Sequence, residues 1–112
     1  MYLDFPDPQI VLRPSDVEWG PYQLDISSAI PSDVIINSVN AESFLRSGLN
    51  DFTAKDIVED SPISIIGDTS FQVYLKGNTT SGRYYIKFTF SLSNGSTKAL
   101  WWGPIVVENS YA

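Results

Sequence analysis

The stretch Tyr84-Tyr85-Ile86-Lys87-Phe88-Thr89-Phe90-Ser91-Leu92 decides the fold, because large apolar residues occupy every second position over nine residues. Successive side chains of a β-strand point to opposite faces of the sheet, so this alternation predicts a half-buried strand. Ser93-Asn94-Gly95-Ser96 follows, and Asn-Gly readily adopts the positive φ values of a type I′ turn. Together the two segments predict a long strand that turns back as a β-hairpin.

The return strand is predicted from Thr97 to Glu108, with an interruption at Gly103-Pro104. Proline has no N–H to donate to a neighbouring strand, so the Gly-Pro pair predicts a bulge or a change of partner strand. Trp101 and Trp102 are adjacent and must therefore point to opposite faces. We expect one of them in the core and the other exposed or covered by a partner.

The rest of the chain repeats the pattern of short strands and turns. Alternating residues over 22–26 and 71–76, β-branched residues over 34–41 and the apolar run 63–66 predict strands, 52–58 predicts a weak one, and 42–51 is expected to be a loop. About seven strands without a convincing helix indicate an all-β fold, an antiparallel β-sandwich. The expected core comprises Leu24, Ile26, Phe71, Val73, Leu75, Tyr84, Ile86, Phe88, Phe90 and Leu92.

A chain of 112 residues has the usual size of one domain. Prolines 6, 8 and 14 interrupt the first residues, so 1–13 is expected to be an extended arm and 14–112 a single sandwich domain. Within the arm, Gln9 to Leu12 can add one short edge strand. Such an arm has no core of its own and is suited to ordering on a neighbouring subunit by strand addition.

The composition argues against several function classes. A net charge of −6 and a pI near 4.3 disfavour nucleic acid and anionic membranes as partners, because both require basic surface. The chain contains neither Cys nor His, which excludes thiolate nucleophiles, imidazole bases and Ser-His-Asp triads. The N-terminus carries no signal-like segment, so synthesis in a cytoplasm without export by a recognisable signal is expected.

Carboxylates are the remaining acid–base groups, and they gather around one stretch of the sequence: Asp51, Asp56, Glu59, Asp60 and, further on, Asp68. Two such groups about 5 or 9 Å apart can hydrolyse a glycoside, and loop acids can bind calcium. These residues lie beside Gly, Pro and Ser, where Asp commonly accepts a hydrogen bond from its own backbone. The spacing also fails to match a calcium-binding EF-hand loop. We therefore expect turn acids, no enzyme activity and no cofactor or metal.

The order of motifs resembles a family of small phage and prophage virion proteins, encoded among tail and head–tail genes and including fibre–tail adaptors. The resemblance rests on Pro14-Ser15-Asp16, Tyr22-Gln23-Leu24-Asp25-Ile26-Ser27-Ser28, the strand beginning Asp33-Val34-Ile35, and Phe71–Gly77 followed by Gly82-Arg83-Tyr84. It spans about Arg13 to Glu108, with a poor match over 42–62 and an unusual Trp101–Pro104. It implies an immunoglobulin-like or fibronectin-III-like sandwich, an assembly role and no catalytic residues.

These observations predict a non-catalytic virion component that binds other tail or connector subunits, or further copies of itself. It would reside in the cytoplasm of the bacterial host before assembly and in the virion afterwards. The expected interface residues are Tyr85, Trp101, Trp102 and Tyr111, because exposed aromatics anchor protein interfaces. The alternative is a carbohydrate-binding or adhesin-like module using the same aromatics. Coplanar exposed rings with polar groups between them would favour a glycan, whereas aromatics within an apolar patch would favour a protein.

Overall fold

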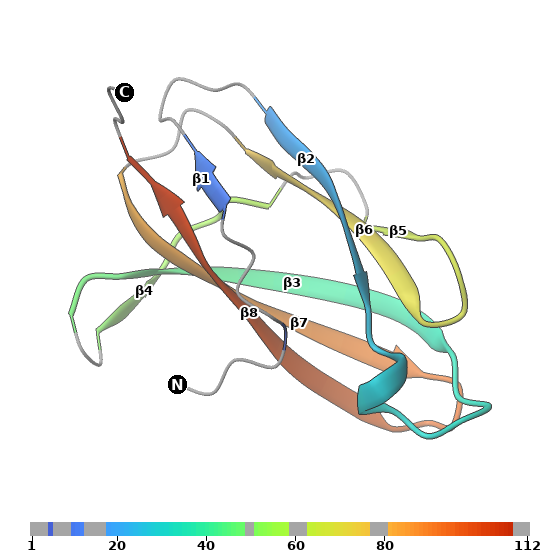
Figure 1. The fold of residues 1–112 in the computed structure, drawn as a ribbon. Helices are drawn as coiled ribbons and strands as arrows, with labels where there is room; N and C mark the ends of the chain where they lie inside the picture. The colour runs from blue at the N-terminus through green and yellow to red at the C-terminus, as the bar shows by residue number, and fades with distance from the viewer. Residues whose placement is uncertain are drawn as a thin grey trace.

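The computed structural model describes Phe5 and residues 10–12, 18–48, 51–58, 63–76 and 81–108. These residues form two β-sheets packed face to face, with one short 3-10 helix, η1 (Ser27–Ala29), between strands (Figure 1). The strands are β1 (Ile10–Leu12), β2 (Glu18–Asp25), β3 (Ile36–Arg46), β4 (Phe52–Ala54), β5 (Ser64–Ile65), β6 (Ser70–Lys76), β7 (Gly82–Leu92) and β8 (Thr97–Val107).

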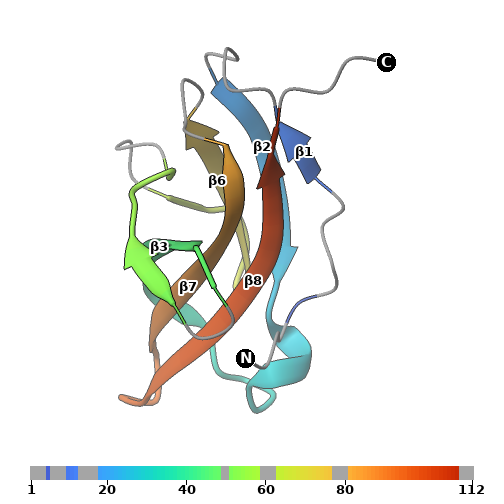
Figure 2. The same cartoon turned by 90° about the vertical axis from the view of Figure 1, so that its left-hand side faces the viewer.

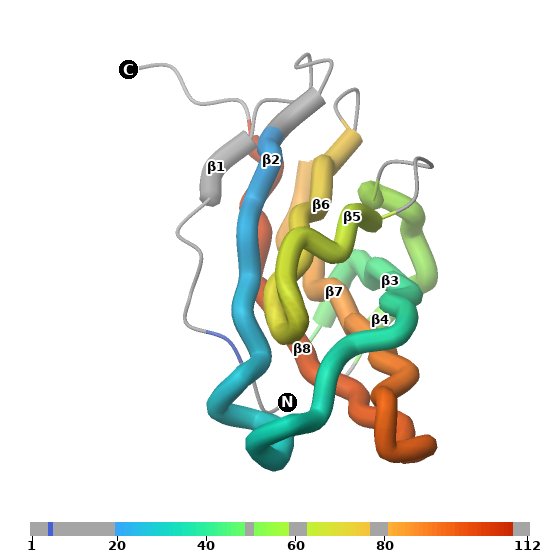
Figure 3. Tube along the Cα trace, turned by 90° about the vertical axis from the view of Figure 1, so that its right-hand side faces the viewer, coloured from blue at the N-terminus to red at the C-terminus, as the bar shows by residue number. Residues whose placement is uncertain are grey.

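The order of the strands is that of an immunoglobulin-like sandwich. One sheet has the order β1-β8-β7-β3-β4, and the other has the order β2-β6-β5. Figure 3 shows the sandwich from the side of β2 and β6, and β8 and the first part of β7 run behind them. Apart from β1, all neighbouring strands are antiparallel. The predicted all-β sandwich is confirmed.

The core between the sheets is built around the strand that decided the fold. The apolar positions of β7, from Tyr84 to Leu92, point inward and are buried, while Thr89 and Ser91 on the other face are more exposed. Phe71 of β6 packs edge-on against Phe88 and Phe90, with ring centroids 4.9 and 5.4 Å apart. All ten predicted core residues are buried in this cluster or, for Leu24, packed against it.

Burial also changes the acidity of two tyrosines at the core. Tyr22 lies edge-on to Trp102, with ring centroids 5.6 Å apart. Burial raises the pKa of Tyr22 to about 12 and raises the pKa of Tyr84 as well, because a phenolate is poorly solvated away from water. Both hydroxyls therefore stay protonated at neutral pH.

The N-terminal segment lies against its own domain where it is described. Strand β1 runs parallel to β8 at the edge of the five-stranded sheet, as Figure 2 shows. Phe5 is only 8% exposed, its N–H donates to the carbonyl of Trp101 at 3.3 Å, and its ring packs edge-on against Phe71 and Phe88. The short edge strand expected near Leu12 is thus present, and it completes this chain's own sheet.

The predicted bulge at Gly103-Pro104 is confirmed. The pairing of β7 with β8 passes from Ile86↔Trp102 to Tyr84↔Ile105, so two residues of β8 face Tyr85 alone. The same irregularity occurs in β2, where Gly20-Pro21 faces Tyr74 of β6. Both Gly-Pro bonds are cis, and each follows a tryptophan. One Trp-Gly-Pro bulge therefore lies in each sheet.

Two local predictions are wrong. The hairpin at 93–96 is not type I′, because Asn94 keeps a negative φ and only Gly95 is positive, at 83°. The N–H of Gly95 donates to the carbonyl of Leu92, so an ordinary turn is followed by a glycine bulge. The first half of the expected loop over 42–51 is strand, since β3 continues to Arg46. The Ser47 N–H donates to the Asp51 carbonyl where the chain turns back towards β4.

Candidate functional site: an aromatic face on the five-stranded sheet

The outer face of the five-stranded sheet carries a group of aromatic and basic side chains. Cross-strand partners lie on the same face of a sheet, and the register pairs Phe44 with Tyr85 and Arg46 with Phe52. It also pairs Lys87 with Trp101. We call the aromatic face the residues Phe44, Arg46, Phe52, Arg83, Tyr85, Lys87 and Trp101.

The rings of this face form two pairs. Phe44 and Trp101 lie 5.6 Å apart between centroids with their planes tilted by 42°, and both are half-buried. Phe52 and Tyr85 lie 5.7 Å apart and meet edge-on at 74°. Neither pair is coplanar.

Arg46 contacts both rings of the second pair, Phe52 and Tyr85. Its guanidinium carbon lies 5.7 Å from the ring centre of Phe52 and 6.0 Å from that of Tyr85. Its Nη1 donates to the Tyr85 hydroxyl at 3.4 Å, and its Nε donates to the Gly48 carbonyl at 3.1 Å. A guanidinium held over two rings keeps its charge at the surface with little freedom to rotate, which suits it to binding a partner.

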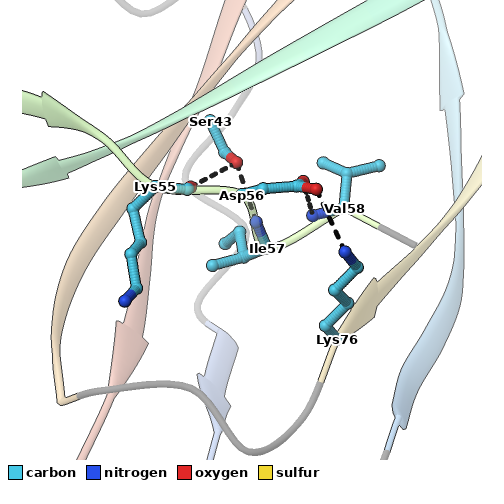
Figure 4. A network of polar contacts seen from close by, with 6 residues as sticks. All are labelled: Ser43, Lys55, Asp56, Ile57, Val58 and Lys76. Carbon is cyan, nitrogen blue, oxygen red and sulfur yellow. Dashed lines mark hydrogen bonds and ion pairs between the residues drawn. The ribbon is translucent and has the colours of Figure 1, made fainter. Parts of the chain in front are cut away.

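A shallow hollow of about 370 Å³ lies beside the aromatic face, where the chain leaves β4 and crosses towards the other sheet. Ser43 is the one buried polar side chain of the described residues, and it forms hydrogen bonds with the crossing segment that follows β4 (Figure 4). Its hydroxyl donates to the Lys55 carbonyl at 2.6 Å and accepts from the Ile57 N–H at 2.9 Å. The hollow is lined by Ala41, Glu42, Ser43, Phe44, Ala54, Lys55 and Asp56.

Of the carboxylates considered for catalysis or calcium binding, the structure shows a structural role for that of Asp56, and it places Asp51 and Asp68 in turns. Asp56 accepts from the Val58 N–H at 3.1 Å with one oxygen and pairs with Lys76 at 3.0 Å with the other (Figure 4). Asp51 belongs to the β3–β4 turn, and Asp68 to the turn before β6. Glu59 and Asp60 lie outside the described residues. Within the described ranges, no three acidic side chains come together as a metal site would require.

Of the four predicted interface residues, two belong to the aromatic face, one lies in the core and one lies outside the described residues. Trp101 lies half-exposed on the aromatic face, as one tryptophan of the pair was expected to. Trp102 is 2% exposed, so it is the member of the pair that lies in the core and it offers almost no surface to a partner. Tyr85 is on the aromatic face but only 5% exposed, because Phe52 and Arg46 cover it. Tyr111 lies outside the described residues.

Phe44 and Arg46 were missed from the sequence because 42–51 was expected to be a loop, and Phe52 was missed because the weak strand predicted over 52–58 had no predicted partner there. The signal for Phe44 and Arg46 was their alternation, with Glu42, in continuation of the preceding strand. A half-exposed aromatic on that alternation belongs to the outer face of the sheet.

Comparisons with known proteins do not assign this chain to a family. A scan against protein-family models and a search of curated proteins found no match to this chain. No helix in the described residues is long and apolar enough to cross a membrane.

Proposed function

We propose that this protein is a non-catalytic assembly component of a phage or prophage virion, acting in the tail or head–tail connector through protein–protein contacts. The resemblance of its sequence motifs to small virion proteins supplies the setting. The aromatic face supplies the means of contact. An acidic net charge favours the solubility of free subunits before assembly.

The observation that carries the proposal is the half-exposed aromatic cluster held on regular strands. Aromatic and arginine side chains dominate the binding energy of protein interfaces, especially where neighbouring groups fix their positions. Phe44 and Trp101 support each other, and Arg46 is held by Tyr85 and Gly48. A partner would therefore meet a surface that needs little ordering on binding.

The ring geometry favours a protein partner over the alternative of a glycan. A sugar chain stacks on coplanar rings separated by polar groups, whereas the two ring pairs here are tilted by 42° and 74°. The rings contact one another, and Ala54 lies beside Phe44 in the register. An apolar patch of this kind is typical of protein contacts.

Site-specific photo-crosslinking tests the proposal. A photoreactive phenylalanine analogue replaces Phe44 in the full chain, and Tyr74 on the outer face of the other sheet serves as the matched control site. Irradiation in cells producing the virion should give a crosslink from position 44 to a tail or connector subunit, or to a second copy, and little from position 74. A crosslink from position 74 alone, or glycan-array binding that Trp101→Ala abolishes, would overturn it.

A further inference from the structure

The end of the sandwich away from the β8 C-terminus consists of three loops that are tied to one another (Figures 1 and 3). The Ile36 N–H donates to the Asp68 carbonyl at 2.8 Å, and the Ser93 N–H donates to the Ile35 carbonyl at 2.9 Å. The Ile26 N–H donates to the Thr69 carbonyl at 2.9 Å. We call the loop end the residues 25–35, 66–69 and 93–96. Its loops hold each other in place, so it presents a defined surface.

The loop end is acidic and partly apolar. Ile35 and Ile66 are 39% and 42% exposed, among the most exposed large apolar side chains described. Asp25, Asp33 and Asp68 are exposed beside them, and the loops contain no Lys or Arg, the nearest cation along the hairpin being Lys98. Hydrogen bonds from Ser27 hold the pKa of Asp25 below its usual value, which keeps that carboxylate ionised.

The aromatic face has the opposite character. Arg46 and Arg83 are direct cross-strand partners, and like charges placed opposite each other destabilise a sheet. Lys87 adds a third cation, opposite Glu42. An acidic protein therefore concentrates three of its seven basic residues on the face that carries its half-exposed rings.

We propose that the loop end of one copy docks onto the aromatic face of a second copy, with Asp33 and Asp68 meeting Arg83 and Lys87 while Ile35 and Ile66 contact Phe44 and Trp101. This inference names the partner of the site in the proposed function and rests on it. Two aromatic faces brought together would oppose their cations, and two loop ends would oppose their aspartates. The complementary contact is head-to-face, and such contacts between identical copies build rings or filaments.

Sedimentation velocity on the full chain over a range of concentrations tests this contact. The loop-end variant combines Asp33→Asn with Asp68→Lys; Asn is chosen because Asp33 has a φ of 71°, which Asn tolerates. The face variant is Arg83→Glu, which places a carboxylate opposite Arg46 and so favours the fold. Lys55→Glu, at the exposed side of the hollow, is the control of equal charge change.

We expect wild type and Lys55→Glu to form species larger than a dimer as concentration rises, weakening with added salt. Each interface variant should weaken association at least 10-fold with its melting temperature maintained. Mixing the two variants should restore association, because the intact loop end of one meets the intact face of the other. A monomeric wild type would overturn the inference while leaving a crosslink to another virion subunit intact. Loss of association in the face variant alone would also overturn it.

Discussion

Gly103 lies directly against Tyr85, where two residues of β8 face one residue of β7. A Cβ atom on Gly103 would come within 2.8 Å of Cδ1 of Tyr85 and 2.9 Å of the Tyr84 carbonyl oxygen. The φ of Gly103 is 152°, which side chains rarely adopt. The absence of a side chain at Gly103 therefore lets β8 lie close to β7 at the bulge.

Gly103→Ala should therefore destabilise the fold through both backbone strain and overpacking. Strain at such a φ costs about 1–3 kcal/mol, and overpacking adds about 1–3 kcal/mol. Gly95→Ala is the matched control, because Gly95 also has a positive φ but nothing lies within 4 Å of its missing Cβ. Urea denaturation should give a clearly larger loss of unfolding free energy for Gly103→Ala. Equal losses would mean that the contact with Tyr85 does not matter.

Truncation of the two adjacent tryptophans should have very different effects on stability. Trp102 is buried against Tyr22 and Phe88, so Trp102→Ala should cost about 3–5 kcal/mol. Trp101 packs on Phe44 at the surface, and its loss should cost about 1 kcal/mol. Thermal and urea unfolding of the two variants measure the difference, and similar losses would contradict the assignment of their faces.

Ser43→Ala should destabilise the crossing between the two sheets. It removes the acceptor of the buried Ile57 N–H and the donor to the Lys55 carbonyl. Leaving buried backbone groups unpaired costs about 1–3 kcal/mol. Ser91→Ala, at an exposed position of β7, is the control and should change stability by less than about 0.5 kcal/mol. Faster amide exchange at Ile57 in Ser43→Ala would locate the effect.

Stability should fall at high pH because of the buried tyrosines. The pKa of Tyr22 is about 12 in the folded chain and 10.0 when unfolded, so between these values the unfolded chain releases the proton first. The contribution of Tyr22 is thus complete below pH 10 and is lost as pH rises towards 12. In Tyr22→Phe the decline over pH 10–12 should be shallower, with the raised pKa of Tyr84 leaving a remainder.

The exposed Tyr74 provides the control for that experiment. Tyr74→Phe should keep the wild-type slope of unfolding free energy against pH. An unchanged slope in Tyr22→Phe would refute the assignment to Tyr22.

Phe5→Ala tests whether the N-terminal segment contributes to its own domain. The ring of Phe5 fills a place against Phe71 and Phe88, so its removal should cost about 3 kcal/mol. The measurement is urea unfolding of the full chain at a concentration where it is monomeric. Unchanged stability there would indicate that the segment serves a neighbouring subunit instead.

The sequence predicted the core strand well because β7 combines strict alternation with large apolar residues. Gly103-Pro104 was also predictable, since proline cannot complete a ladder. The β3–β4 hairpin was not. A shift in register after Ile36 breaks the alternation of β3, and Ser43 is polar yet buried because it binds the crossing chain. The aromatic face was therefore found only in part.

Trp101 and Tyr85 show how far the exposure of a side chain on the aromatic face can be predicted from the sequence. Adjacency fixed which residues must point apart, and the outward position of Trp101 followed once Trp102 entered the core. Nothing in the alternation showed that Phe52 and Arg46 would cover Tyr85, because these residues come from a separate hairpin. Long-range pairing decides such contacts, and local periodicity does not record it.

The parallel pairing of β1 with β8 has a mechanical consequence. The two strands run in the same direction, with Ile10, Val11 and Leu12 opposite Ile105, Val106 and Val107. Tension that pulls the chain before β1 away from the chain after β8 therefore slides the two strands past each other along their length. Their hydrogen bonds are then loaded together in shear and do not open one at a time. We therefore expect the sandwich to resist stretching along the axis of β1 and β8, the first and last strands of the chain.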